Sequence, residues 1–498
     1  MTRAGVLAAA LGAVACSTNS VTIAPIIDVP SNAAASPFPF TQLTMVVAHS
    51  GSDPAVSPLA QATFTTGSTI ELGGVAFADD MVIHLSAGTN ESAYGRTCPF
   101  SVSAGDGVVR PHLYFAHNGS MGALAGIAPL VRIGGDALTY HDGAAVLIGG
   151  ADSNGTPVQD VEKYDPTINA LSQVQQLQPR IGGVAALSGF GETTQVIELG
   201  GTNPAGTDPL TVEILDVDAA PAQRLHHLDD PLGDLSRAGV TATQLAAIQA
   251  SDVGVVAIGG AKTATGDQTD VFVVTTSASN ASTNGSIGSL ASGLTVARTA
   301  HTATRLADEP ESPVLVVGGR ALADGAVTNR TEIFFPGSSA FVKDGPFLTH
   351  ARAQHQAVRL PDNSVLIIGG VDDSGLLVPE IERYTVFDGF FHDVGMLPAG
   401  WAAVDFTATL LPSTASSAQV LITGGRAAIG GAPTSRVGKI GFSLAASATF
   451  SPQDDTPLAT PRANHQATLM CNGMVMISGG TSDSQPIEIY DPGSANQR

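Results

Sequence analysis

The sequence predicts an all-β fold built from one small unit that is repeated many times, and three observations support this. Similar segments recur along the chain; residues 352–370, RAQHQAVRLPDNSVLIIGG, read as two short strands around a tight turn. Pairs of glycines follow short aliphatic runs at regular intervals. Glycine is abundant, with 56 among 498 residues, whereas charged residues make up only 13%. This composition is typical of short strands joined by tight turns rather than of exposed helices.

The N-terminus has the pattern of an export signal. Arg3 supplies positive charge, and residues 6–15 form an apolar run that is too short to span a bilayer, which requires about 20 residues. We therefore expect residues 1–15 to be a signal peptide. The ending Ala-Val-Ala-Cys resembles a bacterial lipoprotein signal, which implies acylation of Cys16 and a location at the outer membrane or cell surface of a Gram-negative bacterium. The alternative is an ordinary secretory signal that is cleaved after Ala15.

Two segments are expected between this signal and the repeats. Residues 16–36 are rich in Ser, Thr, Asn, Pro and Ala, and we expect them to form a flexible, lipidated tether. Residues 37–109 show short alternating runs at close spacing, which predict a small antiparallel β-sandwich. This pattern loosely resembles immunoglobulin-like or transthyretin-like accessory domains, which implies the role of a spacer or a packing partner.

The repeats occupy residues 110–498. Seven glycine pairs end aliphatic strands at intervals of 51 to 59 residues. They are Gly149 and Gly150, Gly200 and Gly201, Gly259 and Gly260, Gly318 and Gly319, Gly369 and Gly370, Gly424 and Gly425, and Gly479 and Gly480. A third strand follows each pair; the best copies are residues 161–166 and 487–492, which end in Tyr-Asp-Pro, and an outer strand precedes the next copy.

This strand order resembles the kelch family, which implies a seven-bladed kelch-type β-propeller. The repeats differ from the family in tryptophan content, because Trp401 is the only tryptophan. The last copy lacks an outer strand, and a spare segment precedes the first copy. We therefore predict that residues 110–132, and within them residues 112–116, close the last blade as its outer strand.

The recurring Arg-x-x-His sequence is the first candidate for chemistry. It occurs as Arg298 and His301, Arg352 and His355, and Arg462 and His465, and arginine alone recurs at Arg132, Arg180 and Arg237. These residues could form a ring of cations around a pocket, or they could bond carbonyls and side chains between blades. A residue that is repeated at the same blade position is better explained by the repeat, because a single active site breaks the symmetry. We therefore interpret these residues as structural.

Other motifs give no catalytic residue, metal or cofactor. His226 and His227 precede Asp229 and Asp230, but this spacing matches no established metal motif. Nucleophile elbows, phosphate loops and His-Glu-x-x-His sequences are absent from the sequence. Cys98 and Cys471 either form a disulfide, which an exported protein permits, or remain as two buried thiols.

The functional prediction is a lipid-anchored binding scaffold of the cell envelope. A net charge of −22 disfavours nucleic acid and anionic lipid surfaces as partners. Loops on one face of a propeller would bind another protein or a glycan. The alternatives are a carbohydrate-binding protein, a sugar oxidase or epimerase, and a purely structural envelope component. An enzyme would require Asp, Glu, His and Arg from different blades to meet at the central channel.

Overall fold

The computed structural model describes most of the chain after residue 19. The described ranges are 20–31, 40–65, 67–87, 92–103, 105–205, 210–230, 234–249, 252–262, 269–277, 285–290, 293–309, 311–337, 341–414, 416–444 and 450–493. The predicted signal peptide, residues 1–15, and Cys16 lie outside these ranges. The described part is almost entirely β-structure, with two short 3-10 helices, Gly191–Thr193 (η1) and Pro221–Gln223 (η2).

Seven four-stranded antiparallel sheets make up the larger part of the described chain. Each sheet is named here after its innermost strand. From the inside outward, the strands of the first three sheets are β12 (Asp136–Thr139), β13 (Ala145–Ile148), β14 (Asp160–Asp165) and β15 (Ala170–Gln176); β16 (Ile181–Ser188), β17 (Gln195–Thr202), β18 (Val212–Leu215) and β19 (Leu225–Leu228); and β21 (Thr241–Gln249), β22 (Asp252–Ile258), β24 (Val271–Ser277) and β25 (Ser286–Ser289). The next two sheets contain, in the same order, β27 (Thr302–Arg305), β28 (Val314–Val317), β30 (Thr331–Phe335) and β31 (Phe341–Asp344); and β32 (Gln356–Arg359), β33 (Val365–Ile368), β34 (Glu380–Thr385) and β35 (Phe390–Met396). The last two contain β36 (Val404–Leu410), β37 (Ser417–Arg426), β38 (Val437–Ser443) and β39 (Phe450–Asp454); and β40 (His465–Leu469), β41 (Val475–Gly479), β42 (Glu488–Asp491) and β11 (Ser120–Ala123). Two short ladders accompany them, β20 (Arg237–Ala238) with β23 (Ala261–Lys262) and β26 (Arg298–Thr299) with β29 (Arg320–Ala321).

The sheets surround a common axis. Their innermost strands contact one another in the cyclic order β12, β16, β21, β27, β32, β36, β40 and again β12. The second strands are apolar and buried on both faces, as in Val365–Ile368 and Val314–Val317, because neighbouring sheets cover them. The protein therefore has the all-β, multi-sheet arrangement of a β-propeller.

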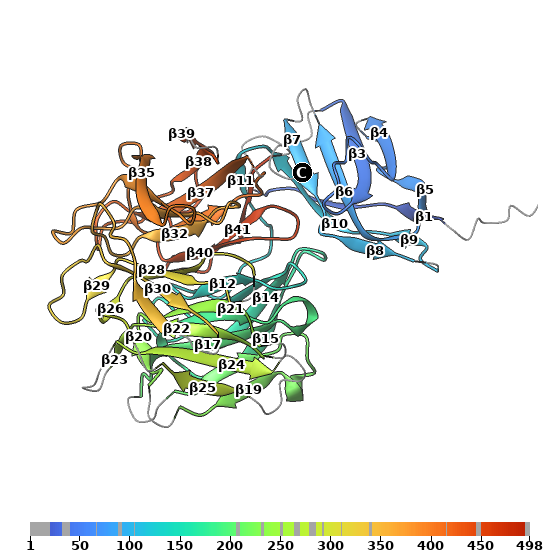
Figure 1. Ribbon diagram of the computed structural model, residues 1–498. Helices are drawn as coiled ribbons and strands as arrows, with labels where there is room; N and C mark the ends of the chain where they lie inside the picture. Colours follow the sequence, from blue (N-terminus) through green and yellow to red (C-terminus); the bar gives the residue numbers. More distant parts are fainter. Residues whose placement is uncertain are drawn as a thin grey trace, which may run out of the picture.

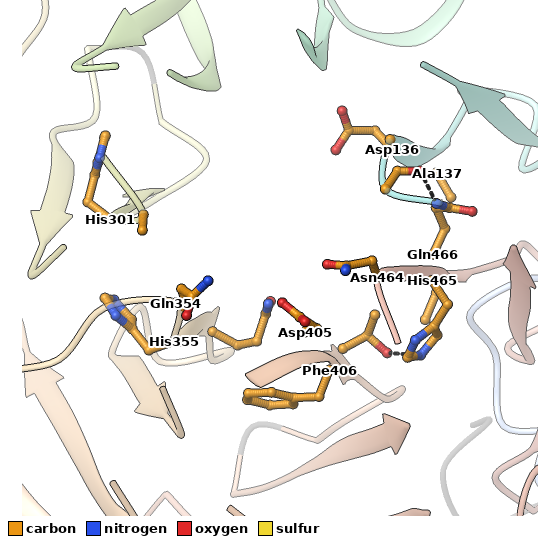
Figure 2. Close-up of a pocket in the computed structure, with 16 residues that line it drawn as sticks. Asp136, Ala137, His301, Gln354, His355, Asp405, Phe406, Asn464, His465 and Gln466 are labelled. Atoms are coloured by element: carbon orange, nitrogen blue, oxygen red, sulfur yellow. Dashed lines mark hydrogen bonds between the residues drawn. The ribbon is translucent and has the colours of Figure 1, made fainter. Parts of the chain in front are cut away.

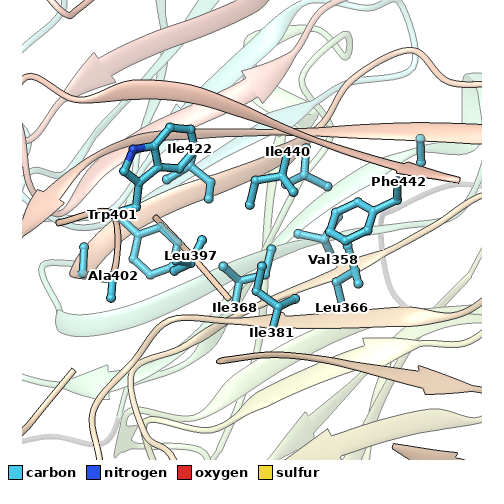
Figure 3. Close-up of a cluster of buried hydrophobic side chains, with 14 of the residues drawn as sticks. Val358, Leu366, Ile368, Ile381, Leu397, Trp401, Ala402, Ile422, Ile440 and Phe442 are labelled. Carbon is cyan, nitrogen blue, oxygen red and sulfur yellow. The ribbon is translucent and has the colours of Figure 1, made fainter. Parts of the chain in front are cut away.

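The cluster of buried side chains between the β32 and β36 sheets shows how neighbouring sheets pack. Val358, Leu366 and Ile381 of the β32 sheet meet Ile422 and Ile440 of the β36 sheet (Figure 3). Each of these side chains is less than one tenth exposed. Burial of an aliphatic side chain of this size stabilises the fold by about 1.5–3 kcal/mol, so these contacts hold adjacent sheets together.

The outer strand of the β40 sheet comes from the N-terminal side of the ring. In β11, Ser120 pairs with Asp491 and Ala123 pairs with Glu488, both in β42. This strand lies within residues 110–132, but our choice of residues 112–116 was wrong. Those residues belong to β10 (His112–His117), which pairs with β7 (Ala93–Arg96) in the N-terminal unit. A turn at residues 118–119 separates β10 from β11, so the chain leaves one sheet and enters the other.

The N-terminal unit consists of two sheets with a shared core. One contains β5 (Leu72–Ala76), β1 (Ser20–Ile23) and β9 (Val108–Val109); the other contains β2 (Ile26–Asp28), β10, β7, β6 (Ala78–Ala87), β3 (Gln42–His49), β4 (Ala60–Thr65) and β8 (Phe100–Val102). Val21 and Ile23 of the smaller sheet pack with Met45, Ile83 and Phe115 of the larger one. The expected tether is therefore wrong over residues 20–28, which form β1 and β2. Alternating burial along β1 outweighs the polar composition of this segment.

The N-terminal unit is docked on the β40 and β12 sheets. Tyr114 and Ala116 of β10 lie in one apolar cluster with Met470, Met474 and Ile489 of the β40 sheet. Cys98 and Cys471 form a disulfide, with their Cα atoms 4.9 Å apart. On the β12 sheet, Asn169 donates a 3.0 Å hydrogen bond from Nδ2 to Asp28. A covalent bond and a shared core thus fix the unit beside the ring (Figure 1).

Candidate functional site

The glycine pairs lie at or just after the end of each second strand. All fourteen glycines have a positive φ, between 57° and 97°, a backbone conformation that residues with a side chain rarely adopt. Gly318 shows the second reason for glycine, because a Cβ there would lie 2.5 Å from the backbone oxygen of Arg352 in the next sheet. Both observations indicate that each pair makes a tight turn packed against the neighbouring sheet.

The repeated arginines form buried ion pairs inside their own sheets. Arg352 is fully buried and donates to the carbonyls of Gly369 at 3.2 Å and Glu380 at 2.8 Å. Its Nη2 also donates to Glu382 at 2.8 Å. Desolvation lowers the pKa of Arg352, and Glu382 opposes this shift. Our expectation that the arginines connect different blades was wrong, because the acceptors lie in the same sheet; their burial also excludes a cationic ring around a pocket.

The glutamate partner recurs with the arginine. The pairs are Arg132 with Glu162, Arg180 with Glu213, Arg298 with Glu332, Arg352 with Glu382, and Arg462 with Glu488. The sequence analysis missed this role of the glutamates. A signal was present, because in these five third strands the glutamate directly follows a valine, isoleucine or threonine. Arg237 differs, because its partner is Asp270.

The repeated histidines connect neighbouring sheets, as predicted. Each Nε2 shares a hydrogen bond with a threonine hydroxyl of the preceding sheet. The pairs are His301 with Thr241 at 3.1 Å, His355 with Thr302 at 2.9 Å, and His465 with Thr407 at 3.1 Å. Desolvation, together with the nearby arginine, lowers the pKa of each histidine to about 3, so all three are neutral at physiological pH.

The β36 sheet replaces the ion pair with an apolar contact. Ala403 stands at the arginine position and Gly438 at the glutamate position of this repeat. The ring of Trp401 packs against Gly438, where an added Cβ would clash with it. Phe406 takes the histidine position. The only tryptophan therefore fills the space that Arg and Glu occupy in other sheets.

A ring of residues in the left-handed backbone conformation lies at the entrance to the axis. Each stands two positions after the repeated arginine, or after Ala403, with φ between 53° and 71°. They are Gly134, Gly182, Gly239, Ala300, Gln354, Asp405 and Asn464. Some are linked by backbone hydrogen bonds between sheets; Asn464 N–H donates to the Asp405 carbonyl at 2.9 Å, and Gly134 N–H donates to Asn464 at 2.8 Å. Residues other than glycine, such as Gln354, strain the backbone in this conformation, and backbone strain often marks a functional position.

A cavity of about 380 Å³ opens at this ring; we call it the axial pocket. It is lined by Gly134, Gly135, Asp136, Ala137, Ala300, His301, Gln354, His355, Gln356, Asp405, Phe406, Thr407, Asn464, His465, Gln466 and Ala467. Asp136, Asn464 and Gln466 group on one side, and Gln354 and His355 lie on the other (Figure 2). The pocket therefore gathers polar side chains from five sheets.

The charges at the axial pocket are few. Asp405 pairs with Arg426, whose Nε lies 3.1 Å from Oδ2. Asp136 accepts a 2.7 Å hydrogen bond from the backbone N–H of Ala185, and burial raises the pKa of its carboxyl to about 6. Among the described residues that line the pocket there is no lysine or arginine. The site is thus rich in amides, with a weakly negative character.

The histidine pair considered as a metal site does not converge. His226 Nε2 contacts the Gln223 carbonyl at 2.8 Å, whereas His227 Nδ1 contacts Thr211 at 3.2 Å. Asp230 accepts the backbone N–H groups of Asp234 and Leu235. These side chains serve local turns and strand contacts.

Within the described residues, one cluster has the composition of a metal site: His350, Glu382 and Asp393, whose ligand atoms lie within 4.8 Å of one another. The Glu382 carboxylate is already occupied by Arg352 and by the backbone N–H groups of Thr349 and His350. We assign no metal to it.

Comparisons with known proteins add little. No family model and no curated protein matches the chain. A solved structure named "Structure of YjhT" matches at 13% identity, with a TM-score of 0.43, over 66% of this chain and 99% of that chain. In the described part of the chain, no helix has the length and apolar character needed to cross a membrane.

Proposed function

We propose that the protein is a seven-bladed kelch-type β-propeller with an N-terminal β-sandwich domain. Seven four-stranded sheets in cyclic contact, the glycine pairs and the Arg–Glu pairs support this assignment. Closure of the last blade by β11 accounts for the missing outer strand at the C-terminal end. The sandwich assignment rests on the two sheets that share the core around Met45 and Phe115.

We propose that the protein binds a small polyhydroxylated ligand, of the carbohydrate class, in the axial pocket. The observation that carries this proposal is the departure of the pocket wall from the repeat. Three repeats have glycine in the left-handed ring, whereas others place the polar side chains of Gln354, Asp405 and Asn464 there. A side chain that breaks the symmetry at a conformational cost is better explained by a ligand than by folding. Amides can donate and accept hydrogen bonds with hydroxyl groups.

Binding rather than catalysis is the better-supported activity. Asp and His meet at the axial pocket, but the repeated Arg and Glu residues are buried elsewhere in their sheets. The three histidines are neutral, with a pKa of about 3, and Nε2 of each is engaged with threonine. A sugar oxidase or epimerase stays a weaker alternative, because few groups that could transfer a proton face the pocket.

The proposed location is the cell envelope. Acylation of Cys16 would anchor the protein at the outer membrane or cell surface of a Gram-negative bacterium. The Cys98–Cys471 disulfide supports export, because such bonds persist in oxidising compartments. Intact-mass analysis of the protein from its native membrane tests the anchor; a product without acyl chains on Cys16 would refute it.

Binding is tested by calorimetry and saturation-transfer NMR with a panel of monosaccharides. The variants Gln354→Gly and Asn464→Gly remove one polar side chain each and install the residue that other repeats carry at this position. Both relieve backbone strain, so the fold should be kept while affinity falls about tenfold for each lost hydrogen-bonding group. Ala300→Gly is the matched control, since it makes the same backbone change without removing a polar group, and it should bind as the wild type does.

A second candidate function is recognition of a protein by the loops that follow the glycine pairs. These loops begin at the same ends of the sheets as the axial pocket, and two of them expose large apolar side chains, Leu376 and Ile429. Cross-linking in whole cells and pull-down of the mature protein tests this candidate. One dominant partner that is lost in the double variant Leu376→Ser and Ile429→Ser would support it.

A further inference from the structure

One carboxylate at the axial pocket has no counterpart in the other repeats. Asp136 is the first residue of β12 and stands four positions after Arg132. The matching positions are uncharged in every other sheet: Val184, Thr241, Thr302, Gln356, Thr407 and Gln466. The propeller therefore does not need a carboxylate here for its repeat.

Asp136 also lacks a cationic partner within the described residues. Its hydrogen bond comes from the backbone N–H of Ala185, and no ion pair involves it. The repeated arginines of the β12 and β16 sheets already form ion pairs, Arg132 with Glu162 and Arg180 with Glu213. A half-buried carboxylate without a cation is costly, because desolvation disfavours its charged form.

A second unusual acid increases the negative charge around this position. Glu198 lies in β17, where the other second strands have aliphatic residues, and its side chain is buried. Desolvation raises the pKa of Glu198 to about 7; Arg180 opposes this, whereas Glu213 and Asp136 add to it. Arg180 also lies 3.6 Å from the Glu198 carboxylate, so Arg132 and Arg180 already serve Glu162, Glu198 and Glu213. Among the described residues, no arginine is left to pair with Asp136.

We propose that the axial pocket selects a polyhydroxylated ligand that carries an ammonium group, such as an amino sugar, and that Asp136 pairs with this group. The inference rests on the proposed binding function and specifies its ligand. Asp136 lies beside Asn464 and Gln466 on one side of the pocket, so a sugar ring could reach the carboxylate and the amides together (Figure 2). The cation would come from the ligand, since the pocket wall contains none. An anionic sugar would meet repulsion from the same carboxylate.

The test compares three matched monosaccharides, D-glucosamine, D-glucose and D-glucuronate, by calorimetry near neutral pH. We expect glucosamine to bind wild-type protein about tenfold to a hundredfold more tightly than glucose, and glucuronate to bind more weakly than both. The Asp136→Asn variant should lose the preference for glucosamine, so that glucosamine and glucose bind it with similar affinity. Its Tm should be unchanged or higher, since the amide can still accept from Ala185 and carries no buried charge.

The control is Asp324→Asn, which removes an exposed loop carboxylate away from the pocket and should preserve the preference. Equal affinity of the wild type for glucose and glucosamine would overturn the inference and leave the proposed function standing. An equal preference for glucosamine in Asp136→Asn would overturn it as well. If none of the three sugars binds the wild type, the proposed function fails, and the inference fails with it.

Discussion

Loss of Arg352 should destabilise the protein far more than loss of a partly exposed arginine in the same sheet. The variant Arg352→Met removes an ion pair to Glu382 and two hydrogen bonds to the carbonyls of Gly369 and Glu380. It also leaves a fully buried carboxylate without its cation. Breaking such a pair from one side costs about 3–5 kcal/mol of unfolding free energy, so we expect a loss of about 4 kcal/mol.

The matched control is Arg359→Met. Arg359 is the last residue of β32 and also contacts a carboxylate, with Nη2 at 2.6 Å from Asp308. In this pair the Asp308 side chain is 71% exposed and that of Arg359 is 25% exposed, so solvent screens their interaction. Exposed pairs contribute about 0–1 kcal/mol, so this variant should change the unfolding free energy by less than about 1 kcal/mol.

A double variant separates charge from packing. Replacing Arg352 with Met and Glu382 with Leu removes the uncompensated charge, so the double variant should be less destabilised than the sum of the single ones by about 2 kcal/mol. Urea unfolding is followed by circular dichroism and by the fluorescence of Trp401, the only tryptophan, which packs between the β32 and β36 sheets. A loss below about 1 kcal/mol for Arg352→Met, or strict additivity in the double variant, would refute the reasoning.

Three further predictions concern other contacts. Gly438→Ala should destabilise the protein by about 1–3 kcal/mol in urea unfolding, because a methyl group there displaces Trp401; unchanged stability would contradict the close packing. Cys98→Ser should lower Tm by several degrees under oxidising conditions and by little under reducing ones, and an equal effect in both would count against the disulfide. Burial raises the pKa of Asp491 to about 8, well above its value in the unfolded chain, so the native state binds the extra proton between about pH 4 and pH 8. Stability should therefore fall by up to about 5 kcal/mol as pH rises across this window, at about 1.4 kcal/mol per pH unit, and Asp491→Asn should flatten the profile.

The repeat itself was readable from the sequence because its constraints recur. Glycine pairs are required wherever a buried strand turns against the next sheet, so the same two residues appear each time. The glutamate partners were present in the sequence but had no assigned role, because the contact joins positions about 30 residues apart. In the β36 sheet the arginine is missing, and only the structure shows that Trp401 and Gly438 replace the ion pair.

The axial pocket could not be predicted in the same way. Gln354, Asp405 and Asn464 are far apart in the chain, and they meet only when the ring closes. The sequence did contain one signal. The residue two positions after the repeated arginine is glycine in some repeats and polar in others. At the N-terminal end, a composition rich in Ser, Thr and Ala concealed β1 and β2, whose strand character depends on pairing with β5, β9 and β10.

The closure of the ring by β11 has a consequence for biosynthesis. Cys98 and Cys471 are separated by 373 residues, and β11 pairs with the last described strand of the chain. A chain that is synthesised from its N-terminus must therefore carry β11 unpaired until nearly all of it has been made. The entropy of closing such a long loop rises only slowly with length, so availability of the partner strand, rather than distance along the chain, controls this step. Truncation before Cys471 would leave an open sheet edge at β11 and a free thiol at Cys98 in the docked N-terminal unit, and both features favour aggregation over folding.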